Sequence, residues 1–366
     1  MYRALFDLIL TRLPPERAHA AAFAALDTLT ARPRPRALLR RLTHLDDELI
    51  TVRALGLSFP SPLGVAAGLD KDAAHFEGLG ALGFGFVEVG TLTPRPQVAN
   101  QPPILARVPR DRALLNRMGF PNKGAEAAAR RLAGRRSPTI VGANVGKNRE
   151  TPLEQAADDY AEAARTLAPC ADYLALNVSS PNTPGLRELQ AVENLRPLVQ
   201  AVRDVVGERP VLVKISPDMS DAEVDAVADL ALELGLAGIV ATNTTLRRDG
   251  LSTPATQVET LAWPDGGGVS GAPLKARSLE VLRRLRARVG DRLVLISVGG
   301  VESADDVWER VLAGATLVQV YTGFVYGGPA WPRAVNLELA RRTWEAGKRS
   351  IQELVGTGVT APGSDQ

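Results

Sequence analysis

Eight short apolar segments are the feature that most constrains how this chain folds, because each of them ends in Gly, Asn, Ser or Thr. Nearly continuous runs of Val, Ile and Leu are typical of strands that are buried on both faces, and such strands belong to parallel sheets. The segments are residues 63–68, 86–90, 139–144, 173–179, 211–216, 238–243, 293–300 and 317–322. We therefore expect a parallel sheet of eight strands.

Helical patterns lie between these segments. Ser220 and Glu223 form a capping-box pattern at one helix start, and Gly235 marks the end of the same helix. The stretch 151–154, Thr-Pro-Leu-Glu, predicts a second start of this kind. Strands that alternate with helices predict a (β/α)8 barrel, and 366 residues suit that fold with insertions. A doubly wound open sheet is the alternative, but the eightfold count favours the barrel.

Residues 1–45 precede the predicted barrel and form a separate helical piece. An apolar stripe at helical spacing predicts a first helix, and a second is expected from Glu16 to about Leu29. The stripe consists of Tyr2, Leu5, Phe6, Ile9, Leu10 and Leu13. Residues 32–41 then hold five Arg in ten positions. One interpretation is a helical hairpin packed on the barrel with a solvated basic linker; the other is an amphipathic hairpin lying on an anionic membrane surface. The pattern alone favours the first.

Composition excludes several classes of function. A formal net charge of +2 gives no sign of nucleic-acid binding, and no apolar run is long enough to span a membrane. Charged residues between Arg3 and Arg17 argue against a secretory signal. The single cysteine, Cys170, excludes an internal disulfide, and with three His and no ligand-like spacing we expect no metal site. We expect residues 46–355 to form the catalytic barrel and residues 356–366 to be a disordered tail.

In a (β/α)8 barrel the active site lies at the carboxyl ends of the strands, and here those ends are rich in small and polar residues. Residues 297–300 and 321–323 follow the last two strands, where such barrels commonly bind phosphate through backbone N–H groups. The loop 266–271 offers further N–H donors. A phosphorylated ligand or cofactor is therefore predicted.

Two lysines are candidates for recognition of an anion. Lys214 lies inside an apolar strand, where an unpaired ammonium is costly, so it needs an anionic partner or a functional reason. Lys71 follows the first strand; a salt bridge at the rim is its alternative, and a structural ion pair is the alternative for Lys214. No Ser-His-Asp set and no P-loop is present, which leaves cofactor chemistry with recognition of a small anion.

The motifs together resemble the class 2 dihydroorotate dehydrogenases, flavin enzymes of pyrimidine biosynthesis that pass electrons to quinone. The resemblance covers about residues 45–330 in order, and its most specific motifs are NRMGF and NVSSPNTPG. The others are AAGLDKD, VGTLTPRPQ, GANVGKN, VLVKISPD, TNTT, GGGVSG and YTGF. It implies a (β/α)8 barrel that holds one FMN per chain and oxidises dihydroorotate to orotate.

The resemblance also implies the ligand contacts. FMN is expected to contact Ala67, Gly68, Leu69, Asp70, Lys71, Thr91, Asn144, Asn177, Lys214, Thr242, Gly271, Gly300, Tyr321 and Thr322. The substrate is expected to contact Lys71, Asn116, Arg117, Met118, Gly119, Phe120, Asn177, Asn182, Asn243 and Thr244. The carboxylate, carbonyls and ring N–H groups of orotate require an ammonium and several amides, which these residues supply.

By the same resemblance the catalytic base is Ser180, where class 1 relatives have Cys. Ser180 would take the C5 proton of dihydroorotate while C6 gives a hydride to the flavin. A serine hydroxyl is a weak base, so we expect help from a relay through Thr244 and water. Ser179, a turn hydroxyl, is the competing assignment. In this resemblance Lys71 pairs with substrate or flavin, and Lys214 lies near the N1/C2=O edge of the flavin.

The resemblance reverses the interpretation of residues 1–45. It implies that they lie on the cytoplasmic face of the bacterial cell membrane and open an apolar tunnel for a membrane quinone, with His19, Arg107 and Tyr321 near the quinone head. The enzyme would then be a peripheral membrane protein, and we expect a monomer. A soluble class 1-like enzyme using fumarate or NAD, a flavin-free sugar-phosphate barrel and a non-catalytic FMN-binding barrel are the alternatives.

Overall fold

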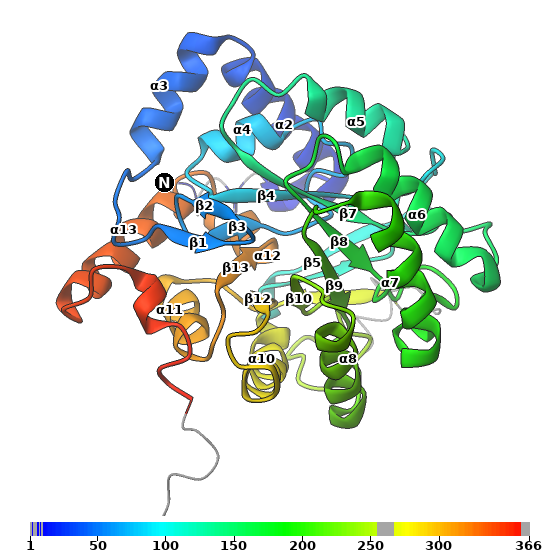
Figure 1. Cartoon of the computed structure of the whole chain (residues 1–366). Helices are drawn as coiled ribbons and strands as arrows, with labels where there is room; N and C mark the ends of the chain where they lie inside the picture. Colours follow the sequence, from blue (N-terminus) through cyan, green and yellow to red (C-terminus); the bar gives the residue numbers. More distant parts are fainter. Residues whose placement is uncertain (1, 3–5, 7, 9, 255–266, 360–366) are drawn as a thin grey trace, which may run out of the picture.

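The computed structural model describes residues 2, 6, 8, 10–254 and 267–359 of the chain. Eight parallel strands close into a barrel in the order of the sequence, which confirms the predicted (β/α)8 fold (Figure 1). The strands are β3 (Leu63–Val65), β4 (Phe86–Leu92), β7 (Ile140–Val145), β8 (Tyr173–Asn177), β9 (Val211–Ile215), β10 (Gly238–Ala241), β12 (Val294–Val298) and β13 (Leu317–Val320). All eight correspond to the predicted segments.

Helices surround the barrel and bury its outer face. They are α4 (Phe76–Ala81), α5 (Ala125–Ala133), α6 (Ala156–Leu167), α7 (Val192–Val206), α8 (Asp221–Glu233), α10 (Lys275–Val289), α11 (Ala304–Leu312), α12 (Thr322–Gly327) and α13 (Trp331–Glu345). The capping box of Ser220 and Glu223 is present at the start of α8. The predicted start at 151–154 is wrong: a 3-10 turn, Leu153–Gln155, precedes α6, and the Thr151 hydroxyl accepts a hydrogen bond from Arg95 instead.

Two small antiparallel sheets were not predicted from the sequence. The strands β1 (Val52–Ala54) and β2 (Leu57–Phe59) form a hairpin. The second sheet pairs β5 (Leu105–Val108) with β6 (Ala113–Asn116), and β6 with β11 (Gly268–Gly271), which comes from a loop far along the chain. This second sheet contributes a wall of the cavity described below.

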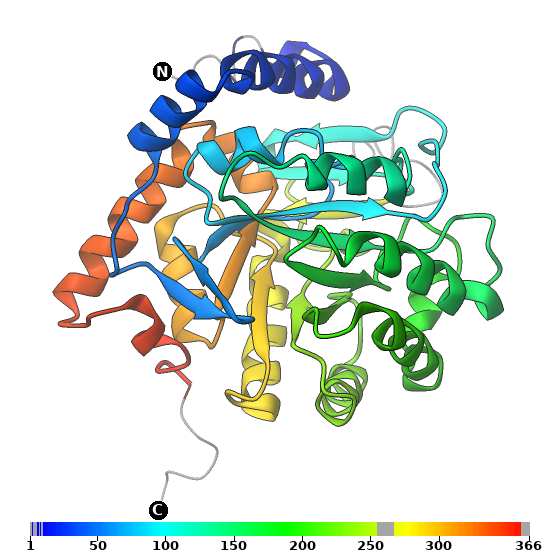
Figure 2. The same ribbon diagram turned by 45° about the horizontal axis from the view of Figure 1, so that its top comes forward.

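The N-terminal piece lies across the outside of the barrel (Figure 2). Its helix α2 (Pro15–Thr30) matches the predicted second helix and packs against α4 and β5. The basic stretch 32–41 is not a linker but most of a helix, α3 (Pro33–Thr43). Of the first predicted helix, Leu5 and Ile9 lie outside the described residues, and Leu10–Arg12 form a 3-10 turn.

The part of the predicted disordered tail that the structure describes is anchored to the barrel. Gly356 and Gly358 donate backbone hydrogen bonds to the carbonyls of Val311 and Leu312 at the end of α11. Residues 360–366 lie outside the described residues. Within residues 10–254 and 267–359, no helix has the length and apolar content needed to cross a bilayer.

Candidate active site

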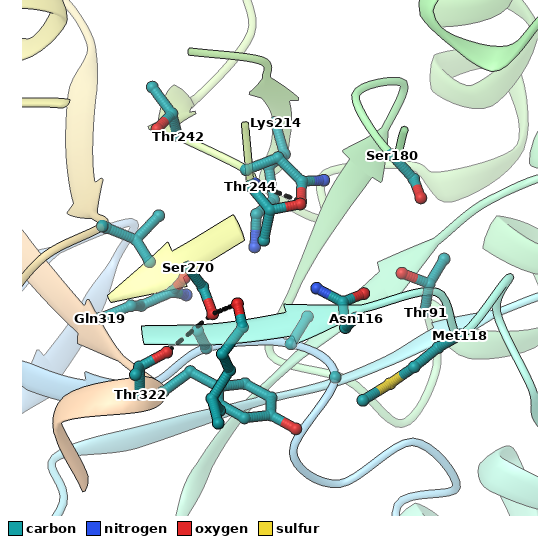
Figure 3. A pocket seen from close by; sticks show the side chains of 18 of the residues that line it. Thr91, Asn116, Met118, Ser180, Lys214, Thr242, Thr244, Ser270, Gln319 and Thr322 are labelled. Atoms are coloured by element: carbon teal, nitrogen blue, oxygen red, sulfur yellow. Dashed lines mark hydrogen bonds between the residues drawn. The ribbon is translucent and has the colours of Figure 1, made fainter. Parts of the chain in front are cut away.

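One cavity opens at the carboxyl ends of the barrel strands, between them and the sheet β5–β6–β11 (Figure 3). Its empty volume is about 1050 Å³, solvent at the mouth included. Figure 3 shows that Lys214 and Ser180 reach it from neighbouring strand ends, whereas Asn116, Met118 and Ser270 come from the extra sheet and the residues that follow it.

Most of the predicted flavin residues line this cavity. They are Ala67, Gly68, Lys71, Thr91, Asn177, Lys214, Thr242, Gly271, Gly300, Tyr321 and Thr322. Leu69, Asp70 and Asn144 do not line it; all three are buried behind its wall.

The predicted substrate residues are likewise brought together. Lys71, Asn116, Met118, Gly119, Phe120, Asn177, Asn182, Asn243 and Thr244 line the cavity, and Arg117 does not. Of the residues predicted near the quinone, Tyr321 lines the cavity, but His19 and Arg107 do not.

Several lining residues were not predicted as contacts. They are Ala66, Gly90, Leu105, Leu114, Pro121, Ser270, Leu274, Val298, Gly299, Val301, Gln319, Val320 and Gly323. Most of them are sequence neighbours of predicted residues at strand ends, so the alternation of side chains along each strand could have indicated that they line the cavity. Leu105 and Leu114 depend on the extra sheet, which no local pattern of residues indicated.

The structure distinguishes the two serines after β8. Ser179 is fully buried, and its hydroxyl donates to Asn177 Oδ1 (3.1 Å) and accepts from Asn243 Nδ2 (2.9 Å). Ser180 lines the cavity, and its hydroxyl accepts a hydrogen bond from the backbone N–H of Asn182 (3.3 Å). The Ser179 hydroxyl is thus engaged in the wall, whereas that of Ser180 faces the space for a ligand.

A ladder of amides and hydroxyls forms the floor between β4, β7, β8 and β10. Thr91 Oγ1 donates to Asn144 Oδ1 (2.6 Å), and Asn177 Nδ2 donates to Thr91 Oγ1 (2.8 Å). Asn243 Nδ2 donates to Asn177 Oδ1 (3.2 Å) and extends the ladder to β10. Asn144 therefore holds Thr91 and Asn177 in place from beneath, which accounts for its position behind the wall.

Beneath the ladder, Lys214 on β9 forms an ion pair with Glu88 on β4, with 3.7 Å between Nζ and Oε1. Glu88 is fully buried and also accepts hydrogen bonds from Asn144 Nδ2 (2.8 Å), Gln319 Nε2 (2.7 Å) and Tyr173 OH (3.2 Å). Burial lowers the pKa of Lys214, and the Glu88 carboxylate acts in the opposite direction. Lys214 therefore forms a structural ion pair and also lines the cavity.

Lys71 lies on the loop after β3, and Asp70 shapes that loop. The Asp70 carboxylate accepts the backbone N–H groups of Ala74 and His75, each at 2.8 Å. Burial lowers the pKa of Lys71, while the nearby Asp70 and Asp72 raise it. Asp70 thus positions the loop, and Lys71 offers the ammonium to the cavity.

The end of β11 and the residues that follow β12 and β13 form a cradle of backbone at one end of the cavity. At Gly271 (φ +100°) an added Cβ would lie 2.3 Å from the carbonyl oxygen of Arg112, and at Gly300 (φ +73°) it would lie 2.5 Å from the backbone nitrogen of Lys275. The backbone N–H groups of Gly300, Thr322 and Gly323 donate to no other residue in the described part of the chain. Such a cluster of N–H donors suits a phosphate dianion.

Three buried side-chain atoms of the lining have no hydrogen-bond partner among the described residues. They are Thr242 Oγ1, Asn182 Oδ1 and Gln319 Oε1. Because buried polar atoms are nearly always satisfied, these three indicate a ligand that offers hydrogen-bonding groups along the cavity.

The comparison with known families decides the class of this site. Residues 49–343 match the family described as Dihydroorotate dehydrogenase. The chain belongs to the dihydroorotate dehydrogenase family. The resemblance seen in the sequence motifs is thereby confirmed.

Relatives within the dihydroorotate dehydrogenase family match along nearly the whole chain. A protein from Rhodococcus opacus named "Dihydroorotate dehydrogenase (quinone)" is 57% identical and covers 98% of this chain and 99% of its own length. One of the same name from Mycobacterium tuberculosis is 54% identical over 95% of this chain and 96% of its own. The crystal structure of DHODH from Eimeria tenella in complex with ferulenol has a TM-score of 0.84 at 33% identity, covering 97% of this chain and 98% of the other.

In this member of the dihydroorotate dehydrogenase family, the N-terminal helices adjoin the cavity from outside. The ring of His19 on α2 is tilted against that of Phe23, with 4.5 Å between centroids, and the centroid of Phe23 lies 4.4 Å from that of His75. Burial, together with the nearby charges of Lys71 and His75, lowers the pKa of His19 to about 4. Arg107 on β5 donates to the Leu13 carbonyl at 2.9 Å.

Proposed function

We propose that this chain oxidises (S)-dihydroorotate to orotate and passes the two electrons to a quinone, a reaction of pyrimidine biosynthesis. The observation that carries the proposal is the convergence of Ser180, Lys71 and several Asn side chains on one cavity. It occurs in a chain that is 57% identical to a quinone-dependent dihydroorotate dehydrogenase over 98% of its length.

We infer that the cavity holds one FMN per chain. The backbone cradle at Gly300, Thr322 and Gly323 suits its phosphate, and the unpartnered oxygens of Thr242 and Gln319 suit its polar ring edges. Lys214 would place positive charge beside the ring, with Glu88 balancing it from beneath. The chemistry supplied by bound FMN would be that of a hydride acceptor for C6 of the substrate and of an electron donor to the quinone.

The substrate would bind between the ladder and the loop after β6. Asn182 Nδ2 donates to Asn116 Oδ1 at 2.9 Å, so these two amides are already oriented by each other, and the Oδ1 of Asn182 stays free for a ring N–H. Lys71 offers its ammonium to the carboxylate, and Asn177 and Asn243 offer further amide groups.

Ser180 is the proposed base. Its hydroxyl oxygen would accept the proton from C5 while the hydride leaves C6, so that the ring loses one proton and one hydride and gains a C5–C6 double bond. The hydroxyl must itself lose a proton for this, and Thr244 with a water molecule is the proposed relay. Thr244 fits this role because it lines the same cavity.

The N-terminal helices are the proposed site of membrane association. Leu29, Leu38 and Leu42 are 50%, 59% and 61% exposed, and α3 also exposes Arg34 and Arg41. Apolar side chains flanked by Arg are typical of helices that lie in an anionic membrane surface. We propose a peripheral monomer on the cytoplasmic face of the bacterial membrane, with His19, Arg107 and Tyr321 near the quinone head.

Anaerobic mixing tests the function in two stages. Dihydroorotate is expected to bleach the flavin absorption of the purified protein, and a ubiquinone or menaquinone analogue is then expected to restore it. Bleaching without restoration would reject quinone as the acceptor, and a colourless protein that takes up no FMN would reject the flavin reaction.

Two charged substitutions on α3 test whether this helix binds a membrane surface. Replacing Leu38 and Leu42 together by Asp should weaken binding to vesicles of anionic phospholipid by about tenfold or more, because apolar burial in the interface is lost and like charge is added. Flavin bleaching by dihydroorotate should not change. Leu337→Asp, at a residue of α13 that is 40% exposed, is the matched control. Equal vesicle binding by the double variant and the unmodified chain would contradict the proposal.

A further inference from the structure

A buried arginine lies directly behind the backbone cradle. Arg310 on α11 is 1% exposed, and its guanidinium donates to Ser297 Oγ (2.8 Å), Ser278 Oγ (2.9 Å) and the carbonyl oxygen of Gly299 (2.5 Å). These partners belong to β12, to α10 and to the glycine loop itself. The side chain therefore reaches from the outer helical layer to the edge of the cavity without contributing to its lining.

The charge of Arg310 is not neutralised by a carboxylate in contact with it. Among the described residues it forms no salt bridge, and Asp306 and Glu309, whose charges act on it from outside contact distance, have other partners. Asp306 pairs with Lys275 at 2.8 Å, and Glu309 pairs with Arg283 at 3.3 Å. A buried cation without a counter-ion is costly, so its presence calls for an anion close by.

The peptide group between Gly299 and Gly300 connects this cation to the cavity. Its carbonyl oxygen accepts a hydrogen bond from Arg310, and the Ser278 hydroxyl, whose one hydrogen also faces the Leu274 carbonyl at 2.8 Å, lies 2.8 Å from it. Its N–H group, on Gly300, donates to no other described residue, and Gly300 lines the cavity. A charged donor on the carbonyl polarises the peptide and strengthens its N–H as a donor.

We propose that Arg310 is a positioning residue that stabilises the phosphate of the flavin through the Gly299–Gly300 peptide. This inference rests on the proposed binding of FMN. The buried guanidinium supplies the counter-charge, and the polarised N–H of Gly300 delivers it to the phosphate oxygens. The alternative is a structural role, in which Arg310 only fastens β12 to α10 and α11.

The two roles differ in their dependence on the phosphate. Full-length protein stripped of flavin is titrated with FMN and with riboflavin, which lacks the phosphate, and the quenching of flavin fluorescence gives both dissociation constants. Arg310→Met should lower the affinity for FMN by about tenfold to hundredfold and the affinity for riboflavin by no more than about twofold, because the lost charge interacts with the phosphate alone. Arg310→Lys, which keeps the charge, should recover much of the FMN affinity.

Two further variants sharpen the comparison. Ser278→Ala removes the hydroxyl that contacts both Arg310 and the Gly299 carbonyl, and it should lower the preference for FMN by a few-fold. Arg135→Met is the control: Arg135 binds the Thr139 carbonyl (3.0 Å) and Asp172 (2.5 Å) near the amino end of β7, away from the cradle. Its preference for FMN over riboflavin should equal that of the unmodified chain.

Each outcome bears on one proposal. If Arg310→Met lowers the affinities for FMN and riboflavin equally, Arg310 has a structural role and this inference is overturned. The proposal that the unmodified chain binds FMN would not be affected. Equal affinity of the unmodified chain for both flavins would instead reject the phosphate cradle itself. If Arg310→Met does not fold, an unchanged preference for FMN over riboflavin in Ser278→Ala overturns the inference.

Discussion

Ser180→Ala is expected to slow the reduction of the flavin by dihydroorotate by about 10²- to 10⁴-fold, the usual contribution of a general base. The variant lacks only the hydroxyl that faces the cavity, and that hydroxyl accepts one weak hydrogen bond from Asn182, so the fold and flavin content should be preserved. Anaerobic stopped-flow measurement of flavin bleaching at saturating dihydroorotate checks the rate of this step directly.

Two neighbouring variants serve as controls. Ser180→Cys restores an ionisable group and should recover part of the rate at alkaline pH, since a thiol loses its proton near pH 8.5. Ser179→Ala removes a hydroxyl that bonds Asn177 and Asn243, so it should affect substrate affinity more than the rate of bleaching. Near-normal bleaching by Ser180→Ala would eliminate Ser180 as the base.

The barrel and the position of its active rim could be predicted because both follow from local patterns. Each barrel strand is a run of apolar residues, and small polar residues mark where each run ends. The choice of Ser180 over Ser179 could not be made from the residues alone. Both are hydroxyl residues of one turn. Only in the three-dimensional structure is it seen that the Ser179 hydroxyl lies in the wall and that Ser180 lines the cavity.

The features missed by sequence analysis depend on partners distant in the chain. The sheet β5–β6–β11 joins residues 105–116 to residues 268–271, a pairing that no local pattern encodes. Residues 32–41, interpreted as a solvated basic linker for their five Arg, form most of α3 and include Pro33 and Pro35. Both lie in the first turn, where a missing backbone N–H costs no helical hydrogen bond, and Arg is a good helix former.

Glu88 shows a signal that was available in the sequence and not used. It is a carboxylate within the apolar segment 86–90, just as Lys214 is an ammonium within the segment 211–216. Opposite charges inside two buried strands predict an ion pair across the barrel, because neither charge is tolerated alone. In the barrel Lys214 Nζ and Glu88 Oε1 lie 3.7 Å apart.

Glu88→Gln is accordingly expected to lower the free energy of unfolding of the flavin-free protein by about 3–5 kcal/mol, the cost of breaking a buried ion pair. The amide leaves Lys214 without a carboxylate. Its NH₂ group would also face groups that donate hydrogen bonds to Glu88 in the unmodified chain, including Asn144 Nδ2 and Gln319 Nε2. Urea unfolding followed by circular dichroism measures the change. Glu302→Gln, which breaks a more exposed pair with Arg112, should cost at most about 1 kcal/mol.

The pH dependence separates loss of this ion pair from simple loss of packing. In the unfolded chain Lys214 has a pKa of about 10.4, and burial lowers the pKa in the fold while Glu88 raises it. Between the two pKa values the unfolded chain binds more protons, so the free energy of unfolding rises with pH. Without Glu88 the folded pKa of Lys214 falls further, so this rise should begin at lower pH and the deficit should shrink in alkaline solution. A deficit that stays constant from pH 7 to 10 would show that the carboxylate of Glu88 does not stabilise the charge of Lys214.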